Sequence, residues 1–410
     1  MRQVCARQHP AEGSRPGCVG DVLALLSPGQ GAQTPGMLAP WLDVEPVADR
    51  LRWACAITGL DLIGLGTTGT DDDVRDTATA QPLLVATALA VAGAIVSETA
   101  RPSVVAGHSV GEYAAAALAG VLTPETALVL VRERGRLMAD ASQQSPTGMS
   151  ALLGGDADEV RQALSRHGLT AANVNAAGQV VAAGSLEALT ALAADPPTGA
   201  RIRPLSVAGA FHTAHMEPAR ASLATLAHAA PTRDPLVTIV SNADGAVVTS
   251  GSDLLERLVA QVAAPVRWDL CMQTFADLGV TAVVELAPAG TLTALVRRAL
   301  PGVETLAIKS PDDLAAARAL VERHCDSTHE PGPAWRLAVA PVAGTFRPGA
   351  AEPGTSLAPG GSVGTVVSHR SESTVEAVHG GVLVEWLAQD GDPVSPGQPV
   401  ALLHPQPVLA

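Results

Sequence analysis

Lysine is nearly absent from this 410-residue chain, since Lys309 is its only lysine and the other cationic side chains are arginines. Schiff-base catalysis and cofactors that are attached through an amide to lysine both need a lysine amine. Such chemistry therefore has one candidate residue at most. Aromatic residues are also scarce, at 2% of the chain against 47% apolar residues, so we expect a large core built from aliphatic side chains.

Cysteines are few and scattered. The five are Cys5, Cys18, Cys55, Cys271 and Cys325. None forms a Cys-x-x-Cys pair, so the sequence predicts neither a disulfide framework nor a zinc site, and no metal is expected. Isolated cysteines are typical of the reducing cytoplasm, where we expect the protein to work.

The charge balance argues against several classes of partner. The formal net charge is −14, which disfavours binding to the phosphate backbone of a nucleic acid. The N-terminus carries arginines but not the apolar stretch of a signal peptide. The apolar run at residues 83–96 is too short to cross a bilayer, so we expect no membrane partner.

The chain is organised around a Gly-x-Ser-x-Gly motif formed by Gly107, Ser109 and Gly111. Residues 102–106 before it are β-branched and bounded by proline and glycine, which predicts a buried strand. Residues 112–119 after it favour a helix. A strand-to-helix turn is the structural context of a nucleophile elbow, in which the glycines leave room beside an exposed serine hydroxyl. The pattern therefore favours Ser109 as a nucleophile over a simple packing turn.

The length predicts one large domain or two to three medium ones. The sequence pattern changes at about residue 146. From there short segments follow in the order strand, helix, strand, strand, helix, strand, which is ferredoxin-like and indicates a small inserted subdomain. Upstream, a helix is expected at residues 82–99, because Pro82 suits a helix start, where its missing N–H costs nothing. The expected parts are a disordered extension at 1–20, a large α/β subdomain at 21–145 and 209–310, the small subdomain at 146–208, a helix and linker at 311–333, and a C-terminal domain at 334–408.

A serine nucleophile needs a base, and the chain offers eleven histidines. His108 adjoins Ser109, but neighbouring side chains at a tight turn point apart, which favours a structural role. His212 lies in an irregular segment after a predicted strand and fits an active-site loop, while His215 is a weaker candidate. Sequence spacing alone does not pair any of them with the serine.

Five motifs in a fixed order resemble one family. They are residues 28–33, 107–112, 134–138 and 209–212, and Gln261 followed by residues 265–268. Together they resemble the malonyl-CoA:acyl carrier protein transacylases, a family also found as acyltransferase domains of polyketide synthases, over roughly residues 22–310. The resemblance implies an α/β-hydrolase-like core with an inserted ferredoxin-like subdomain. It also implies transfer of a malonyl group from malonyl-CoA to acyl carrier protein, in fatty acid or polyketide synthesis.

The resemblance assigns catalytic roles to four residues. Ser109 would take the acyl group as an ester, and His212 would be the general base and then the acid for the thiol leaving group. Gln30 and the backbone N–H of Val110 would form the oxyanion hole. The reaction implied is a ping-pong transfer through an acyl-serine ester.

Further roles concern the substrate. Arg134 would bind the malonyl carboxylate with its planar guanidinium, although a run of arginines is ordinarily a solvated helix face. Gln261 would support His212 in place of a triad acid, and Gln81 would line the site. Phe211 and an aliphatic side chain at Val110 would favour malonyl over methylmalonyl by narrowing the space beside the acyl Cα.

A serine esterase or thioesterase remains the enzymatic alternative, because it uses the same elbow. Arg134 separates the two, since a simple esterase has no need of a buried guanidinium. The sequence does not identify the pathway, the carrier protein or the oligomeric state.

Residues 334–408 lie outside that resemblance and consist of short strands with regular Gly and Pro turns. They resemble a biotinyl/lipoyl carrier domain, a small all-β barrel. Alignment on residues 375–377 places Arg370 where the modified lysine of such carriers stands. Arginine forms no amide with biotin or lipoate, so we expect no attached cofactor. A non-catalytic carrier is thereby disfavoured, while a docking or structural module and a vestigial fusion both stay open.

Overall fold

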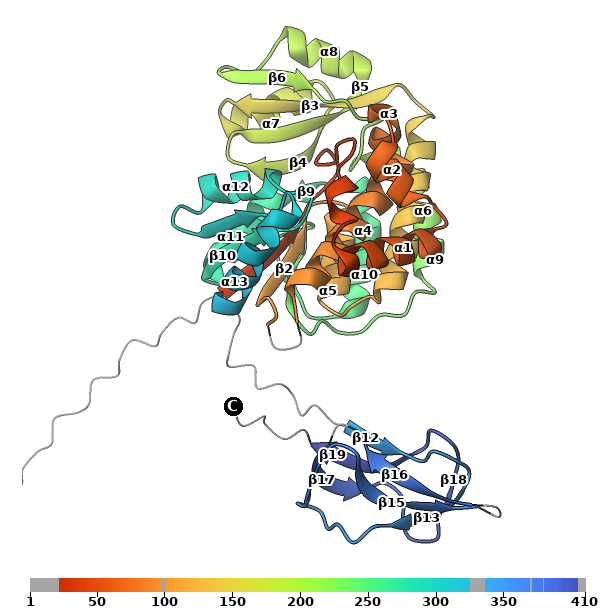
Figure 1. The fold of residues 1–410 in the computed structure, drawn as a ribbon. Helices are drawn as coiled ribbons and strands as arrows, with labels where there is room; N and C mark the ends of the chain where they lie inside the picture. Colours follow the sequence, from red (N-terminus) through yellow and green to blue (C-terminus); the bar gives the residue numbers. More distant parts are fainter. Residues whose placement is uncertain (1–21, 98–99, 325–335, 369–370, 379, 405–410) are drawn as a thin grey trace, which may run out of the picture. The chain divides into compact units, whose positions relative to one another are not determined.

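The computed structural model describes residues 22–404 except 98–99, 325–335, 369–370 and 379. It divides the chain into two compact units, Met1–Asp326 and Ser327–Ala410 (Figure 1). The expectations for residues 1–20, for the linker at 326–333 and for Arg370 lie outside the described residues.

A six-stranded sheet forms the centre of the first unit, in the order β11-β10-β1-β2-β7-β8. The strands are β1 (Val22–Ser27), β2 (Val104–Gly107), β7 (Thr238–Val240), β8 (Val247–Val248), β10 (Val280–Glu285) and β11 (Glu304–Ala307). All neighbouring pairs are parallel except β7 and β8. Parallel strands are buried on both faces, which explains the unbroken apolar runs in the sequence.

Side-chain alternation along β1 divides the core into two layers. Leu23 and Leu25 pack on one face of the sheet, and Ala24 and Leu26 pack on the other, because successive strand residues point to opposite faces. Helices cover both faces (Figure 1). The first layer includes α1 (Glu45–Thr58), α4 (Thr77–Ile95), α5 (Gly111–Leu118) and α6 (Pro124–Ser142), and the second includes α11 (Trp268–Asp277) and α12 (Thr291–Ala299).

Three neighbouring strands deliver three polar segments to one edge of this sheet. Gln30 follows β1, Ser109 follows β2, and Asn242 follows β7. Because β1, β2 and β7 are adjacent and parallel, their carboxyl ends meet at the same edge. Ligand sites of open α/β sheets form at this edge.

A second, smaller sheet lies above this edge in Figure 1. Its elements are β3 (Thr147–Gly154), α7 (Ala157–Arg166), β4 (Thr170–Ala176), β5 (Gln179–Ser185), α8 (Leu186–Ala194) and β6 (Ala200–Pro204), joined by β9 (Val266–Arg267). The strand order is β6-β3-β5-β4-β9, antiparallel except between β4 and β9. The order of strands and helices expected after residue 146 is thus observed.

Helix α4 differs from the expectation for residues 82–99. It begins at Thr77, because the Asp76 side chain accepts a hydrogen bond from the Ala78 N–H and caps the helix there. Pro82 therefore lies inside the helix and not at its start. The helix has 19 residues and is long and apolar enough to cross a membrane, so the expectation of a run that is too short is wrong on length. Of its most apolar stretch, 72% is buried within the unit, as in the core helix of a folded domain.

Among the other helical elements, α13 (Leu314–His324) lies in the segment 311–333 where a helix was expected. Short helices such as α2 (Leu62–Thr68) and α3 (Asp71–Arg75) were not expected from the sequence. The remaining helical elements are η1 (Ala39–Trp41), η2 (Ala214–Met216), α9 (Glu217–Ala227), α10 (Gly251–Ala260), η3 (Gln261–Ala263) and η4 (Pro311–Asp313). A reciprocal capping box between Thr70 and Asp73 starts α3, and Pro218 lies in the first turn of α9. These signals are local side-chain bonds that a search for long apolar periodicity passes over.

The second unit contains only strands among its described elements. They are β12 (Arg336–Val339), β13 (Gly344–Pro348), β14 (Ser356–Leu357), β15 (Gly361–Val367), β16 (Glu372–Ala377), β17 (Gly381–Trp386), β18 (Pro393–Val394) and β19 (Pro399–His404). They form two four-stranded sheets, β12-β19-β17-β14 and β16-β15-β13-β18. Phe346, Val366, Val375 and Leu403 belong to the apolar core of this unit.

Replacing Leu25 by Ala tests the central sheet as the core of the first unit. Leu25 is fully buried in β1, so Leu25→Ala should lower the free energy of unfolding by about 2–5 kcal/mol. Leu236→Ala is the matched control, because Leu236 is 71% exposed and its truncation should cost less than about 0.5 kcal/mol. Urea unfolding measures both; equal losses in the two variants would contradict this placement of the core.

Candidate active site

The elbow at Ser109 gains its shape from close backbone approach at its two glycines. A Cβ on Gly107 would overlap the carbonyl carbon of Gly111, and a Cβ on Gly111 would overlap the Ser27 carbonyl oxygen. Neither glycine has a positive φ; Ser109 itself does, with φ 52°. The backbone strain of the turn therefore lies on the serine, where a left-handed conformation costs about 1–3 kcal/mol.

Ser109 lies against His212. Its Oγ is 2.7 Å from His212 Nε2, and His212 Nδ1 is 2.7 Å from the backbone carbonyl oxygen of Gln261. A carbonyl only accepts hydrogen bonds, so Nδ1 carries the ring proton and Nε2 presents its lone pair to the serine hydroxyl. This tautomer suits a base that takes the Ser109 proton. A carbonyl stands where a triad carboxylate would, which is the arrangement the family resemblance implied.

The environment of His212 keeps its imidazole neutral. Burial and, to a smaller extent, the positive charge of Arg134 lower its pKa from 6.5 to about 3, although the hydrogen bond to the Gln261 carbonyl raises it. The residue has φ 60°. Ser109 and His212 are the described non-glycine residues with positive φ, so backbone strain coincides with the reactive pair.

Arg134 differs from the neighbouring arginines of α6. Arg132 and Arg136 are exposed and pair with Glu133 and Asp140, whereas Arg134 is 1% exposed. Its guanidinium points toward the elbow and makes no ion pair with a described carboxylate, and burial lowers its pKa. The solvated-face interpretation therefore holds for two of the three arginines but fails for Arg134.

Glutamines hold the Arg134 guanidinium on two sides. Its Nη1 donates to Gln81 Oε1 at 2.6 Å, and its Nη2 donates to Gln261 Oε1 at 2.8 Å. Nη2 also lies 3.4 Å from Ser109 Oγ. The Nε–H finds no acceptor among the described residues, and the guanidinium carbon lies 5.7 Å from the centre of the Tyr113 ring.

Two buried polar residues near Ser109 escaped the sequence analysis. Asn242 Oδ1 accepts from the Ser109 N–H at 2.7 Å, and Asn242 Nδ2 donates to the Gly107 carbonyl at 2.8 Å. Glu112 accepts from the Asn242 N–H at 2.7 Å and from Gln261 Nε2. Glu112 could have been noticed in the sequence, because it is a carboxylate in the otherwise apolar start of α5. No feature of the sequence around Asn242 indicates a role in the site.

A cavity of about 280 Å³ opens onto Ser109 and His212 between the two sheets of the first unit. Gln30, Gln81 and Phe211 line it, together with residues of β3, β4 and β5. Val110 does not line it, since its side chain is buried in the helical layer of the core. The expectation of a Val110 wall beside the acyl group is therefore wrong, while the place of Phe211 agrees with a role in narrowing the site.

Two backbone N–H groups near the serine have no hydrogen-bond acceptor among the described residues. The N–H groups of Val110 and Gln30 make no hydrogen bond to a described residue, and the Gln30 side chain donates to Thr77 Oγ1 at 3.3 Å. The Ser109 N–H is already taken by Asn242. Both N–H groups are therefore available to donate to an oxyanion.

The other two candidate histidines, His108 and His215, are not placed to act as the general base for Ser109. His108 Nε2 bonds to Asn175 Oδ1 at 2.8 Å, its ring meets Trp268 edge-on at 5.6 Å, and burial lowers its pKa. A Cβ on Gly29 would come within 2.8 Å of His108 Nδ1, so the turn after β1 packs on this ring. His215 is exposed on η2 and does not line the cavity. Among the described residues, no cluster of three His, Cys, Asp or Glu side chains could hold a metal ion.

Comparison with known proteins gives this geometry its context. Residues 25–319 match the family described as "Acyl transferase domain". The chain belongs to this family. It is 49% identical over 296 residues to the malonyl CoA-acyl carrier protein transacylase of Mycobacterium tuberculosis, covering 72% of this chain and 98% of that protein. The corresponding protein of Escherichia coli strain K12 is 34% identical over 302 residues, covering 72% of this chain and 98% of that protein.

Solved structures agree. The crystal structure of the M. tuberculosis protein superposes with a TM-score of 0.70, covering 72% of this chain and 99% of that one at 49% identity. A complex titled as a type II PKS acyl-carrier protein with its malonyl-transacylase superposes with a TM-score of 0.69 at 30% identity, covering 73% of this chain and all of that one. The mixed α/β fold of the first unit is therefore that of the acyl transferases.

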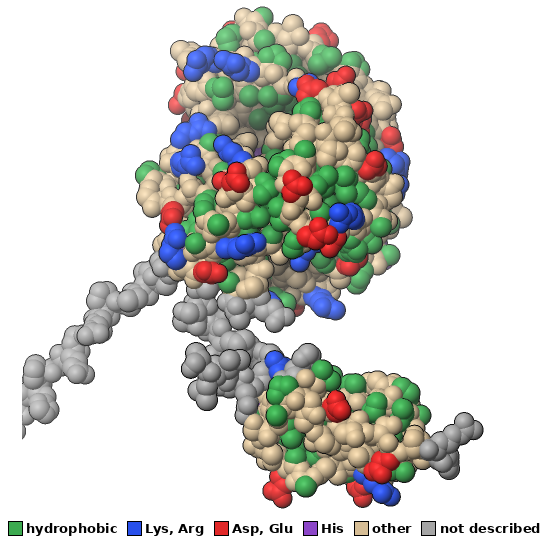
Figure 2. Space-filling model, viewed as in Figure 1, with side chains coloured by type: hydrophobic (Ala, Val, Ile, Leu, Met, Phe, Trp, Pro, Cys, Tyr) green, Lys and Arg blue, Asp and Glu red, His purple; other side chains and the backbone are tan. Residues whose placement is uncertain are grey.

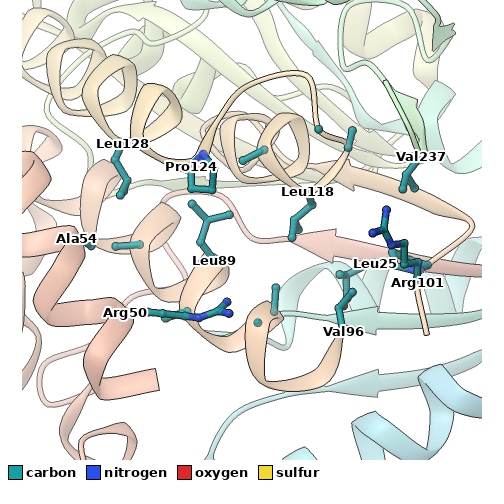
Figure 3. A pocket seen from close by; sticks show the side chains of 18 of the residues that line it. Leu25, Arg50, Ala54, Leu89, Val96, Arg101, Leu118, Pro124, Leu128 and Val237 are labelled. Atoms are coloured by element: carbon teal, nitrogen blue, oxygen red, sulfur yellow. The ribbon is translucent and has the colours of Figure 1, made fainter. Parts of the chain in front are cut away.

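A second, larger cavity of this acyl transferase lies apart from the site. It measures about 670 Å³ and shares no lining residue with the cavity at Ser109. Figure 3 shows apolar side chains such as Leu89, Leu118 and Leu128, with Arg50 and Arg101 at its borders. It brings together no nucleophile and base, so the smaller cavity is the candidate active site.

The pH dependence of the reaction tests the state of His212. Because its pKa is about 3 in the free protein, the second-order rate constant for acylation by p-nitrophenyl acetate should stay level as the pH falls through 6.5. Such rate constants report the ionisations of the free enzyme. Stopped-flow release of p-nitrophenol measures them.

The Arg134→Ala variant provides the control for this profile. Arg134 lowers the pKa of His212. Its removal should therefore move the acid limb of the profile, the pH range in which protonation of His212 lowers the acylation rate constant, to higher pH. A wild-type limb centred near 6.5, or no movement in the variant, would contradict the assignment.

Proposed function

We propose that this acyl transferase moves a malonyl group from malonyl-CoA to the phosphopantetheine thiol of an acyl carrier protein. The observation that carries the proposal is the buried Arg134 guanidinium, whose Nη2 lies 3.4 Å from Ser109 Oγ and which makes no ion pair with a carboxylate of the described residues. The relatives named above are malonyl CoA-acyl carrier protein transacylases, at identities of up to 49%. One solved neighbour is a complex with an acyl carrier protein.

The first half-reaction forms the acyl-serine ester. His212 Nε2 takes the Ser109 hydroxyl proton while Oγ attacks the thioester carbonyl, and the Val110 and Gln30 N–H groups stabilise the oxyanion. The C–S bond then breaks. The departing CoA sulfur takes the proton from His212, leaving malonyl on Ser109 and His212 neutral again.

The second half-reaction reverses these steps with a different thiol. The phosphopantetheine thiol gives its proton to His212 and attacks the ester carbonyl. The C–Oγ bond breaks, and Ser109 recovers its proton from His212, which releases malonyl-thioester product. Ser109 is 9% exposed, and its burial limits the water that would hydrolyse the ester.

Arg134 supplies the preference for a carboxylated acyl group. A carboxylate is a stronger acceptor for a guanidinium than an amide oxygen is. Gln81 lines the cavity, whereas Arg134 and Gln261 do not. Because Gln81 accepts from Arg134 Nη1, the malonyl carboxylate reaches the guanidinium by displacing the Gln81 oxygen. Phe211, at the cavity wall, favours malonyl over a branched acyl group.

A serine esterase of the hydrolase type is the alternative. It would share Ser109, His212 and the oxyanion donors. It would gain nothing from Arg134, whose burial costs free energy unless a substrate anion compensates it. This cost favours the transferase.

The acidity of the chain is compatible with anionic substrates, because charge is distributed. Both signs are interspersed over the face drawn in Figure 2. Arg298 donates to Gln179, which lines the cavity, and so offers a positive charge at its rim. Cys55 and Cys271 are free thiols, which supports the cytoplasm as the place of the reaction.

The finer features of the fold are also part of the proposal. The six-stranded sheet and elbow support an α/β-hydrolase-like core, and the order β6-β3-β5-β4 supports a ferredoxin-like insert. The paired four-stranded sheets of Ser327–Ala410 support a biotinyl/lipoyl-like barrel. With Arg370 at the lysine position we infer that it carries neither cofactor and acts in docking or structure.

Intact-mass spectrometry tests the central step. Incubation with malonyl-CoA should raise the mass of the chain by one malonyl group, and Ser109→Ala should abolish the increase, because the ester forms on Oγ. Addition of holo acyl carrier protein should return the mass to its starting value and malonylate the carrier.

The same spectra contain the controls. Release of malonate without malonylation of the carrier would indicate the hydrolase, and malonylation of Ser109→Ala would contradict the nucleophile. A biotin or lipoate mass on the untreated chain would contradict the interpretation of Arg370.

Substitution of Arg134 tests the malonyl preference. Arg134→Ala should lower kcat/KM for malonyl-CoA by about a hundredfold or more, the cost of a lost charge-assisted bidentate contact. It should raise transfer of acetyl relative to malonyl, measured by competition between the two CoA esters. An unchanged ratio would reject the role of Arg134 while leaving the Ser109 step intact.

A further inference from the structure

Asn242 and Glu112 are fully buried polar residues that take no part in the proton transfers above. We propose that they are positioning residues for malonyl transfer: Asn242 sets the nucleophile Ser109, and Glu112 sets the Arg134 guanidinium through Gln261. The inference rests on the proposed function, because it takes Ser109 as the acyl acceptor and Arg134 as the carboxylate site.

Asn242, which follows the neighbouring strand β7, holds the elbow in place through hydrogen bonds. Its side-chain amide spans the serine, accepting from the Ser109 N–H and donating to the Gly107 carbonyl. Ser109 has the left-handed φ of 52° that its side chain disfavours. The two bonds from Asn242 offset this strain and hold Oγ opposite His212. They also withdraw the Ser109 N–H from the oxyanion hole.

Glu112 holds Arg134 in place indirectly, through Gln261, on the side away from the cavity. The Gln261 amide lies between them, with Nε2 donating to Glu112 Oε2 and Oε1 accepting from Arg134 Nη2. A carboxylate on one side and a guanidinium on the other permit one orientation of this amide. When the substrate displaces Gln81 on the cavity side, Gln261 still holds the guanidinium in place.

The amide spacer leaves Arg134 open to substrate. A carboxylate in direct contact would neutralise the guanidinium and compete with malonyl, whereas Glu112 acts one residue away. Both Glu112 oxygens face N–H donors, from Asn242 and Gln261, which is the pattern of a carboxylate. Burial raises the pKa of Glu112 to about 8, opposed by the Asn242 N–H and by the charges of Arg134 and Arg257.

Two acyl donors separate the two positioning roles. Malonyl-CoA needs both Ser109 and Arg134, whereas p-nitrophenyl acetate needs Ser109 but has no carboxylate. Single-turnover acylation is measured with each donor at about pH 9, above the Glu112 pKa, where the wild type presents a carboxylate. Burst amplitudes count the folded sites, so a loss of folded protein does not lower the rate constants.

Asn242→Ala should slow acylation by both donors by a similar factor of about ten or more, with little change in malonyl-CoA affinity, because Ser109 loses its orientation. Glu112→Gln turns an acceptor toward Gln261 Nε2 into a donor, which rotates the amide and releases Arg134. It should slow malonyl-CoA about tenfold more than the ester, through a higher Kd. Glu125→Gln, on an exposed carboxylate of α6, should change neither reaction.

Two results would overturn the inference. They are wild-type rate constants in Asn242→Ala, and an unchanged ratio of the two donors in Glu112→Gln, whether both rate constants stay the same or fall together. Gln261→Glu tests the same relay independently, because it brings a carboxylate onto Arg134 and should also penalise malonyl-CoA selectively; an unchanged ratio would reject the relay. Failure of the wild type to accept malonyl would instead reject the proposed function.

Discussion

The left-handed backbone at Ser109 is the constraint on which the rest of the site depends. With φ at 52° the serine leaves the line of β2 and turns its hydroxyl toward His212, while the chain continues into α5. The turn requires Gly107 and Gly111, since any Cβ there would overlap backbone. The strain of about 1–3 kcal/mol persists because β2 lies in the middle of a buried parallel sheet that cannot adjust.

The same sheet explains why distant residues meet. Gln30, Ser109 and Asn242 are far apart in sequence, but each follows one of three adjacent parallel strands. Parallel neighbours bring their carboxyl ends together without any special side-chain attraction. His212 comes from a loop after the small sheet, and its own left-handed φ of 60° completes the approach to the serine.

The sequence predicted those parts of the structure that depend on local pattern. The strand before Ser109, the helix after it and the strand and helix order of residues 147–204 all follow from short-range periodicity, and the structure agrees. Helix α4 shows where that reasoning fails. Proline statistics placed its start at Pro82, but the Asp76 cap places it at Thr77, and the buried helix tolerates the proline within it.

Contacts between residues that lie far apart in the sequence could not be predicted from local sequence patterns. Nothing in the spacing of α6 distinguishes Arg134 from Arg132 and Arg136; only the packing of α6 against its neighbours buries the middle one. The pairing of His212 with Ser109 came from family resemblance and not from spacing. Asn242 and Glu112 carried no recognised motif role, since their hydrogen bonds join segments 130 or more residues apart.

The burial of Arg134 is costly, and this cost has a functional consequence. A desolvated guanidinium without a contacting carboxylate destabilises the fold relative to an apolar side chain of similar size. Two amide oxygens and the Tyr113 ring compensate it only in part, and its Nε–H has no described acceptor. A substrate carboxylate supplies the missing counter-charge in a low-dielectric site, where the attraction is strongest. Binding of the malonyl carboxylate thus offsets the destabilisation that the buried Arg134 causes in the free protein. An acetyl group has no charge and does not offset it, so malonyl binds more strongly.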